Sequence, residues 1–481
     1  MSNYATPGVY IKEISTLPAS IAAVETAIPA FIGHTNIAGP SNGLRGIPTR
    51  ITSMLEYESL FGFANPETIT VTIADTYTGE NNQPAKQVAR SISVAAITQS
   101  NYEMYYALRL FFDNGGGPCY IVSVNDFTAP PTVGNSTTAN SLLGGLAALE
   151  KVDEPTLILF PDKLSLANAK SVYDQALAQC EKLQDRFVIM DVKVNTANPI
   201  TDADNFRNTG IGSGSLKYGA AYYPNLKTAL PIGYNSGSVT INQSHTYIGT
   251  GTSNPVITNP ANGSNLTALS SADPSLHRSI LAELAKQFAT VSPSGAVAGI
   301  FARVDSQRGV WKAPANVDVR SIIGPAVKVT HEQQANLNVD ASSGKSINVI
   351  RSFTGKGTLV WGARTLAGND NEWRYVPVRR LFIFIEESVK KATEFVVFEP
   401  NDANTWLRVK TMIENFLSKL WRDGALAGAK PEEAFFVRVG LGQTMTAQDI
   451  LEGRMNVEIG LAAVRPAEFI ILKFSHKLQE S

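Results

Sequence analysis

A strand, a helix and a second strand follow one another between residues 156 and 190, and this unit constrains the fold most strongly. Residues 156–160 form a short apolar run that ends at Pro161. Apolar residues then recur at every third or fourth position across 165–183, which predicts an amphipathic helix. A second apolar run occupies 187–190. A unit of this length favours two parallel strands joined by a right-handed crossover, so we expect an α/β domain.

The size and composition of the chain indicate several folded domains. Its 481 residues are about three times a typical domain of ~150, and 44% of them are apolar, which excludes a wholly disordered chain. The 41 Lys and Arg against 42 Asp and Glu give a net charge of -1, which argues against a nucleic-acid coat or a polybasic membrane binder. The two cysteines, Cys119 and Cys180, exclude a disulfide framework and a cysteine-rich zinc site. Cys180 falls on the apolar stripe of the predicted helix, so we expect it to pack in the core.

No segment has the pattern of a secretory signal or a membrane span. The first thirty residues carry Lys12, Glu13 and Glu25 and contain no continuous apolar run. No window approaches the roughly 18 apolar residues that a membrane span requires. We therefore expect the protein to be made and folded in the cytosol, without direct insertion into a membrane.

Charge is unevenly distributed along the chain. Residues 228–272 contain no charged residue and are rich in Gly, Ser, Thr and Asn, which predicts a polar insertion with some β structure. From Glu372 onward charged residues are dense. In that part, residues 401–404 supply capping residues for a helix that ends near Trp421. Strand candidates follow at 434–439, 455–461 and 468–474, so we expect a compact α+β module there.

No catalytic or cofactor motif is complete. Residues 39–43 match the spacing of a nucleophile elbow, but the residues that follow cannot begin a helix. Residues 343–346 resemble the end of a phosphate-binding loop, but Val339 stands where the first glycine is required. The five histidines never occur at the spacing of a metal-ligand pair, and Asp402 is better explained as a helix cap than as the partner of Glu399 in a paired acid. The sequence therefore predicts no enzyme site, no metal and no cofactor.

A series of short motifs runs through the N-terminal and later parts of the chain. In chain order, the motifs occupy 6–14, 26–33, 295–299, 302–316, 361–365, 373–380, 395–402 and 466–469. Together they resemble contractile phage tail sheath proteins, most of all the sheaths of phage-tail-like contractile injection systems. They stand in the family's order, and several motifs in one order are far more specific than any single motif. Residues 36–294 carry no motif of this kind.

The resemblance implies a mechanical function. Sheath subunits of this family stack as rings around an inner tube, and contraction drives the tube and its spike into a target envelope. The implied partners are further copies of the chain, the tube protein, and baseplate and terminator or cap proteins of a phage virion or phage-tail-like particle; nucleic acid is not among them. Open helical assembly of this kind requires heterologous contacts that do not close into a ring. Two alternatives remain open: an α/β enzyme whose site forms only in the fold, and a baseplate scaffold that shares the sheath domain.

The predicted organisation has four parts. They are an N-terminal arm strand at 1–20, an outer α/β domain at 21–365 that includes the insertion at 228–272, an inner tube-proximal α+β domain at 366–465, and a C-terminal arm strand at 466–481. The charge shift near Glu372 and the resemblance together motivate an inner domain built from both chain ends.

Both arms are expected to exchange strands with neighbouring copies, as the resemblance implies. The N-terminal arm comprises Val9, Tyr10, Ile11, Lys12, Glu13 and Ile14, and the C-terminal arm comprises Glu468, Phe469, Ile470, Ile471, Leu472 and Phe474. Each run is too short to be stable alone and exposes backbone groups that need a partner. The expected acceptors are the strands that contain Phe435, Val437, Val457 and Ile459, which would receive the arms by β-augmentation. The alternative is that both ends pair within their own subunit.

A sheath must grip its tube and then release it, so we expect a polar, salt-sensitive contact. The candidate tube-facing residues are Lys410, Lys419 and Arg422, on the predicted helix and its exit. The alternative is that they form only the solvated face of an amphipathic helix.

Overall fold

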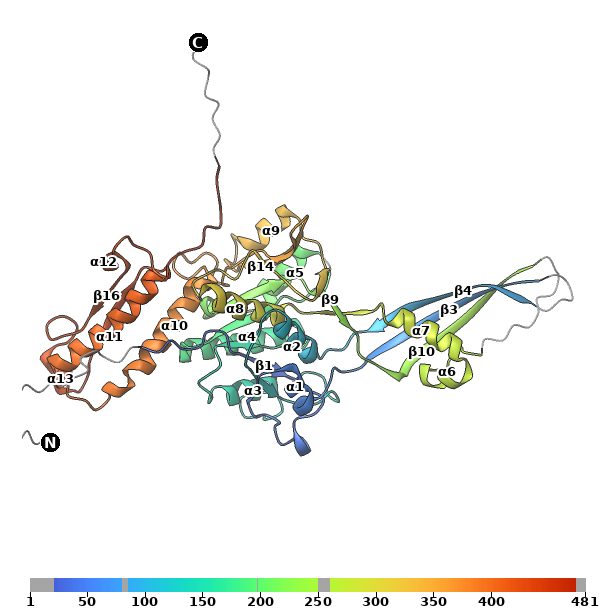
Figure 1. Ribbon diagram of the computed structural model, residues 1–481, viewed down its shortest axis with the longest axis horizontal. Coiled ribbons are helices and arrows are strands. Elements are labelled where there is room, and N and C mark those ends of the chain that lie inside the picture. Colours follow the sequence, from blue (N-terminus) through green and yellow to red (C-terminus); the bar gives the residue numbers. More distant parts are fainter. Residues whose placement is uncertain (1–20, 80–84, 197, 250–259, 473–481) are drawn as a thin grey trace, which may run out of the picture. The chain divides into compact units, whose positions relative to one another are not determined.

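The computed structural model describes residues 21–79, 85–196, 198–249 and 260–472 (Figure 1). The chain divides into two compact units. The large unit comprises Glu25–Ile383 and Arg465–Ser481, and the small unit comprises Met1–Val24 and Phe384–Val464. The boundary between Ile383 and Phe384 falls inside helix α10 (Val376–Thr393).

The large unit is built on a nine-stranded sheet with the order β12-β15-β14-β8-β7-β6-β1-β5-β2. Its parallel centre consists of β14 (Ile347–Phe353), β8 (Gly219–Tyr223), β7 (Phe187–Asp191), β6 (Leu157–Leu159), β1 (Pro29–Gly33) and β5 (Cys119–Ser123). The antiparallel edges are β12 (Val317–Asp318), β15 (Gly357–Val360) and β2 (Thr49–Ile51). Every residue of β1, β5, β6 and β8 is buried, as is typical of parallel strands covered on both faces.

Helices cover both faces of this sheet. They are α2 (Met104–Asp113), α3 (Leu142–Leu149), α4 (Leu166–Leu183) and α8 (Ser294–Arg308). The ring of Phe31 on β1 lies 5.5 Å from that of Phe111 on α2, whereas Ile32 lies against Gly145 on α3. Successive strand residues point to opposite faces, so α2 and α3 cover opposite faces. Helix α8 packs beside α2, and α4 packs beside α3.

The strand–helix–strand unit predicted at 156–190 is confirmed. Strands β6 and β7 are parallel neighbours, and α4 connects them. The Ser165 side chain caps α4 by accepting a hydrogen bond from the backbone N–H of Asn168 (3.2 Å). Cys180 is completely buried on this helix, in agreement with its expected packing role.

Two glycines allow α8 to approach α2 closely. A Cβ atom on Gly295 would lie 2.3 Å from the carbonyl oxygen of Ala107, and one on Gly299 would lie 2.4 Å from that of Phe111. Real Cβ atoms cannot approach backbone so closely, so this helix pair requires glycine at both positions. The motif at 295–299 is thereby explained by packing.

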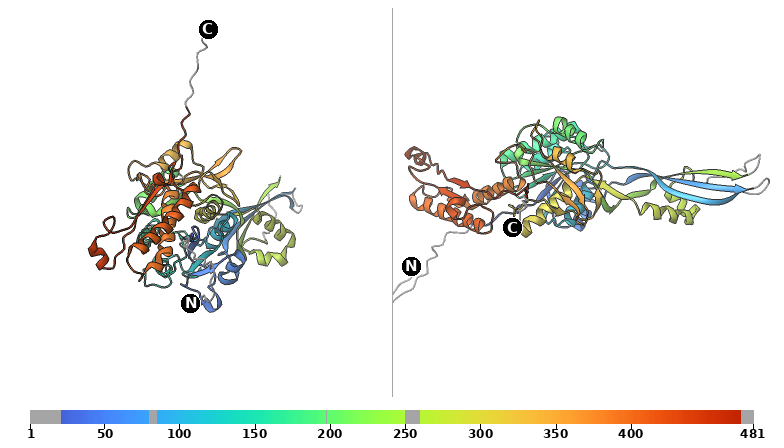
Figure 2. Two further views of the ribbon diagram at one scale, coloured as in Figure 1. Left: turned by 60° about the vertical axis from the view of Figure 1, so that its left-hand side comes forward. Right: turned by 90° about the horizontal axis from the view of Figure 1, so that it is seen from above.

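A second sheet of the large unit, named here the blade, has the strand order β10-β3-β4. It consists of β3 (Glu67–Gly79), β4 (Lys86–Thr98) and β10 (Tyr234–Gly249), with α6 (Leu266–Ala272) and α7 (Pro274–Leu284) packed against it. Figure 2 shows the three strands running side by side. The uncharged segment 228–272 thus supplies β10 and α6, but its partner strands lie far earlier in the sequence.

The remaining elements of the large unit are short. Strands β9 (Leu226–Pro231), β11 (Phe288–Val291) and β13 (Ile322–Pro325) form a small antiparallel sheet with β9 in its centre. The other helices are α1 (Met54–Phe61), α5 (Pro199–Asn205) and α9 (His331–Asn338).

The small unit combines the end of α10 with a long helix, two short helices and an antiparallel pair of strands. Its elements are α11 (Ala403–Arg422), α12 (Pro431–Ala434), β16 (Phe435–Arg438), α13 (Ala447–Leu451) and β17 (Glu458–Leu461). Asp402 caps α11 by accepting a hydrogen bond from the N–H of Thr405 (2.9 Å), as predicted. The buried face of α11 consists of Val409, Met412, Ile413, Phe416, Leu417 and Leu420.

Two of the predicted strands differ from the structure. The strand expected at 455–461 forms only from Glu458 to Leu461. The strand expected at 468–474 is not formed over the described residues 468–472, which have no regular secondary structure. A strand needs a hydrogen-bonding neighbour, and no strand of the described residues pairs with 468–472.

Candidate functional site

The sheet of the small unit is incomplete by itself. Strands β16 and β17 are antiparallel, with Val437 opposite Ile459 and Phe435 opposite Leu461. In the described part of the chain this sheet has two strands, so each strand has one edge without a strand partner. Val457 lies just outside β17 and is half-buried. A two-stranded sheet is marginal in water, and its open edges are suited to receive further strands.

The C-terminal arm exposes four consecutive apolar side chains. Their exposed fractions are 70% for Phe469, 80% for Ile470, 80% for Ile471 and 72% for Leu472. Such a run is costly in water unless a partner covers it. Phe474 lies outside the described residues.

The N-terminal arm residues Val9, Tyr10, Ile11, Lys12, Glu13 and Ile14 all lie outside the described residues. The first anchored position of the small unit after them is Val24, whose N–H donates to Oγ of Ser388 on α10 (3.3 Å). Two residues further on, Thr26 belongs to the large unit and is hydrogen-bonded to Arg380 and Asp305 of that unit.

Glu468 fixes the start of the exposed apolar run. Arg364 donates to both carboxylate oxygens, from Nε to Oε1 (2.9 Å) and from Nη2 to Oε2 (2.6 Å). Tyr375 Oη also donates to Oε2 (3.0 Å) and Asn338 Nδ2 to Oε1 (2.6 Å). Burial alone would raise the pKa of Glu468, but hydrogen bonds from Arg364 and Asn338 and the charge of Arg364 lower it. The carboxylate is therefore held in its charged form.

A second arginine holds the chain near the other end. Arg380 on α10 donates from Nη1 to Oδ1 of Asp305 (3.0 Å) and from Nη2 to the carbonyl oxygen of Thr26 (2.8 Å). The hydroxyl of Thr26 donates to Oδ2 of Asp305 (2.6 Å). Both charged side chains are buried, at 3% and 6% exposure.

Sequence reasoning did not identify these arginine sites as functional. Each of these residues lies in a motif of the family resemblance: Arg364 in 361–365, Arg380 in 373–380 and Asp305 in 302–316. The motifs were therefore the only sequence feature that pointed to these positions. The ion pairs themselves join residues about 100 and 75 positions apart, which a single sequence does not reveal.

The structure does not bring the three predicted tube-facing residues onto one face. Lys410 and Lys419 are nine residues apart on α11, which places them on opposite sides of the helix at 100° per residue. Lys419 and Arg422 share an exposed face, whereas Lys410 is partly exposed and lies 3.8 Å from Glu414.

The usual ligand position of a doubly wound sheet is filled by side chains in this chain. In such folds, ligands bind at the carboxyl ends of the strands where the strand order reverses, here between β1 and β6. His34 follows β1 and Asp162 follows β6, and both are buried and joined by a contact of 2.7 Å from Nδ1 to Oδ2. Burial raises the pKa of Asp162, although His34 opposes this.

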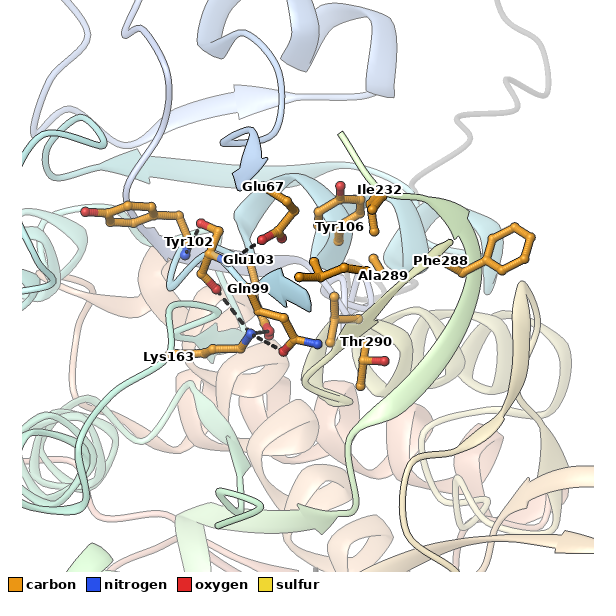
Figure 3. Close-up of a pocket in the computed structure, with 13 residues that line it drawn as sticks. Glu67, Gln99, Tyr102, Glu103, Tyr106, Lys163, Ile232, Phe288, Ala289 and Thr290 are labelled. Carbon is orange, nitrogen blue, oxygen red and sulfur yellow. Dashed lines mark hydrogen bonds and ion pairs between the residues drawn. The ribbon is translucent and has the colours of Figure 1, made fainter. Parts of the chain in front are cut away.

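A small pocket lies where the blade joins the rest of the large unit (Figure 3). Its volume is about 30 Å³, a space suited to ordered water. Lys163 Nζ lies 3.0 Å from Glu103 Oε1 and donates to Gln99 Oε1 (3.1 Å). Burial raises the pKa of Glu67, which accepts the Ser100 N–H (2.6 Å). These charges have internal partners, so the cluster fastens the blade instead of binding a substrate.

Across the residues that the structure describes, no three side chains are grouped so that they could hold a metal ion. Within the same residues, no helix combines the length and apolar character needed to cross a membrane.

Two family models match most of the chain. The phage tail sheath protein central domain matches residues 135–366, and the phage tail sheath C-terminal domain matches 368–477. Among curated proteins, the tail sheath protein of Vibrio phage KVP40 is 27% identical over 127 residues, which are 26% of this chain and 19% of that protein. The tail sheath protein of Burkholderia phage BcepMu is 30% identical over 142 residues, 28% of this chain and 29% of that protein. The matched segments therefore span less than a third of these curated relatives.

Solved structures match over nearly the whole length. The anti-feeding prophage baseplate chain is 34% identical, with a TM-score of 0.63 and coverage of 99% of this chain and 100% of that one. The helical sheath of the anti-feeding prophage in the contracted state is 34% identical, with a TM-score of 0.63 and coverage of 98% of this chain and 100% of that one. The contracted sheath complex of the extracellular contractile injection system PVC is 29% identical, with a TM-score of 0.62 and coverage of 99% of both chains. The chain therefore belongs to the phage tail sheath family, the structural subunits of contractile phage tails and phage-tail-like injection systems.

Proposed function

We propose that this chain polymerises helically around an inner tube and that the polymer contracts to drive the tube and its spike into a target envelope. Membership of the sheath family supports this function, as does similarity to a helical sheath in the contracted state. Assembly takes place in the bacterial cytoplasm, and the partners are further copies, the tube, and baseplate and terminator or cap proteins.

The observation that carries the proposal is the exposed apolar run at 469–472. Four adjacent apolar side chains, each at least 70% exposed, follow directly on an anchored Glu468. In an extended strand these side chains would point alternately to the two faces, and among the described residues no strand pairs with the run. A sheet edge on a neighbouring copy satisfies both requirements at once.

The acceptor in this proposal is the β16–β17 sheet of a neighbouring small unit. An N-terminal arm and a C-terminal arm from other copies add to its open edges and convert a marginal two-stranded sheet into a larger one. Main-chain hydrogen bonds then persist while rigid units rotate and slide, so the lattice changes shape without separating. In this arrangement the small unit is the inner, tube-proximal part and the large unit is the outer part.

A proline substitution in the arm tests strand exchange directly. Ile470→Pro removes a backbone donor, whereas Ile470→Thr keeps the donor and the β propensity at the same exposed position. Both variants should fold, because the side chain is exposed in the single chain. We expect the full-length Thr variant to form cylinders in electron micrographs and the Pro variant to remain unassembled. Normal cylinders from Ile470→Pro would refute the proposed strand exchange.

A further inference from the structure

Both chain ends are fastened to the large unit just after they enter it. The chain passes from the small to the large unit between Val24 and Glu25 and again between Val464 and Arg465. Thr26 and Glu468 lie two and four positions beyond the small unit at these passages. Each of them is bound by a buried arginine of the large unit.

The C-terminal clamp consists of Arg364, Glu468, Tyr375 and Asn338. The guanidinium of Arg364 is 5% exposed and grips the carboxylate with two parallel hydrogen bonds, while Tyr375 and Asn338 occupy the remaining acceptor positions. Arg364 also donates to the carbonyl oxygen of Gly368 (3.3 Å). Bidentate, charge-assisted bonds of this kind are among the strongest polar contacts in proteins. Directly beyond this clamp, the four apolar side chains of 469–472 are exposed.

The N-terminal clamp consists of Arg380, Asp305 and Thr26. It holds the backbone carbonyl and the hydroxyl of Thr26 together, so the main chain itself is gripped. The guanidinium of Arg380 also lies over the ring of Phe301, 4.5 Å from its centroid. The contact with the ring and the low exposure of the pair keep water away from this clamp.

The geometry has a mechanical consequence for strands exchanged between copies. Tension on an exchanged strand passes along the chain to the residues that hold it. For the C-terminal arm this residue is Glu468, and for the N-terminal arm the residues are Val24 in the small unit and then Thr26 in the large unit. If the root were loose, tension would peel the adjacent contacts apart one at a time. A bidentate clamp must instead lose several hydrogen bonds at the same time. Both clamps also lie in the large unit, whose nine-stranded sheet forms an extensive core.

We infer that the Arg364–Glu468 and Arg380–Asp305–Thr26 clamps are anchors that transmit tension from neighbouring copies of this chain through both arms into the large unit. This inference rests on the proposed strand exchange. The clamps need not contact a neighbour themselves. Their task is to keep the arm roots in place when the lattice contracts.

The test uses full-length protein assembled into cylinders. Glu468→Gln weakens the C-terminal clamp, and Asp305→Asn weakens the N-terminal one, with little change in side-chain shape. Arg364→Lys retains the charge but removes the bidentate grip, and it provides a milder variant if Glu468→Gln fails to fold. The matched control is Glu283→Gln, which breaks an exposed ion pair between Glu283 on α7 and Lys286 just beyond this helix.

We expect the clamp variants to fold and to form cylinders that break under calibrated shear or during contraction, with mean length reduced at least fivefold relative to wild type and Glu283→Gln. Clamp variants whose cylinders survive shear and contraction at wild-type length would overturn the inference. The Ile470→Pro variant separates the two levels. If it assembles normally, strand exchange itself is wrong; if it does not assemble while clamp variants survive shear, only the anchoring inference fails.

Discussion

Asp75 on β3 and Arg90 on β4 stand directly opposite each other in the blade and form a bidentate ion pair. Arg90 donates from Nε to Oδ1 (2.6 Å) and from Nη2 to Oδ2 (3.0 Å), and Gln243 of β10 donates to Oδ2 (2.7 Å). All three strands therefore meet at one buried carboxylate. The same face of β3 otherwise buries Ile69, Val71 and Ile73. Because a slip of one residue would turn Asp75 to the other face, this pair specifies the register of the blade.

Replacing Asp75 should loosen the blade while leaving the nine-stranded sheet intact. Asp75→Asn leaves Arg90 without its charged partner, and breaking a buried ion pair costs about 3 kcal/mol. Hydrogen exchange followed by mass spectrometry should show faster exchange in β3, β4 and β10 and unchanged exchange in β1 and β6. Glu283→Gln, at an exposed pair, is the control. Equal blade protection in Asp75→Asn and wild type would show that the pair does not hold the register.

Adding one methyl group between α2 and α8 should destabilise the large unit. In Gly299→Ala, the new Cβ would meet the carbonyl oxygen of Phe111 at 2.4 Å, so the helices must separate. Overpacking of this kind costs about 1–3 kcal/mol. Gly117→Ala is the control, because no atom lies within 4 Å of the position of its Cβ. Urea denaturation should give a lower midpoint for Gly299→Ala than for Gly117→Ala, and equal midpoints would contradict the packing argument.

The stability of the large unit should fall as pH rises toward neutrality because of Asp191. Burial raises the pKa of Asp191 to about 7, although hydrogen bonds from the N–H (2.8 Å) and hydroxyl (2.6 Å) of Ser294 oppose this. The folded pKa exceeds the unfolded value, so the contribution of Asp191 is full below about pH 4 and is lost as pH rises to about 7. At 1.36 kcal/mol per pKa unit, the loss is up to about 4 kcal/mol.

Asp191→Asn removes this titration and keeps acceptor and donor atoms for Ser294. Its free energy of unfolding should vary less with pH between 5 and 8, and the variant should be the more stable protein at pH 8. Denaturation curves at each pH measure both quantities. Parallel pH profiles for the two proteins would mean that Asp191 is not the titrating group.

Local sequence patterns predicted the elements whose contacts are local. The unit β6–α4–β7 and the capped helix α11 follow from apolar spacing and from Ser165 and Asp402, all within one turn of the helices they cap. Of the blade, the sequence predicted only the β structure at 228–272. Its pairing was not predicted, because β10 pairs with β3 about 170 residues earlier. No local pattern encodes that partner. Likewise, the β-type residues of 468–474 predicted a strand, and the described residues 468–472 do not form one. A strand forms only where another segment pairs with it, and the residues of the run do not encode that segment.

The candidate site shows the same limit. The exposed apolar arm could be read from the run Phe469–Ile470–Ile471–Leu472, whereas the grip of Arg364 on Glu468 depends on the fold. Helical geometry also corrects the grouping of basic residues. Lys410 and Lys419 look equivalent in sequence, but the helix places them on opposite sides.

That separation allows a controlled test of tube binding on one helix. Lys419→Glu with Arg422→Glu reverses two charges on one exposed face of α11, whereas Lys410→Glu reverses a charge on the other side. If the face with Lys419 and Arg422 meets the tube, the double variant should bind tubes at least tenfold more weakly at low salt, and the difference should shrink as salt screens the contact. Cosedimentation with tubes measures this. Equal loss from Lys410→Glu, or no loss from the double variant, would assign these residues to the solvated surface.

Deleting residues 1–15 tests the N-terminal arm and leaves its root in place. The deletion ends before Val24, which is bonded to Ser388, and before Thr26, which is gripped by Arg380 and Asp305. The truncated protein should therefore keep both units folded, with a wild-type melting temperature and a monomeric sedimentation coefficient. It should nevertheless fail to form cylinders, because Val9–Ile14 would no longer be available to a neighbouring sheet edge. Adding the intact chain should not rescue the truncated one beyond short, irregular oligomers, since each truncated copy interrupts the chain of exchanged strands. If the truncated protein polymerises alone into cylinders of normal length, the N-terminal arm does not link the subunits, and the C-terminal arm must hold the lattice by itself.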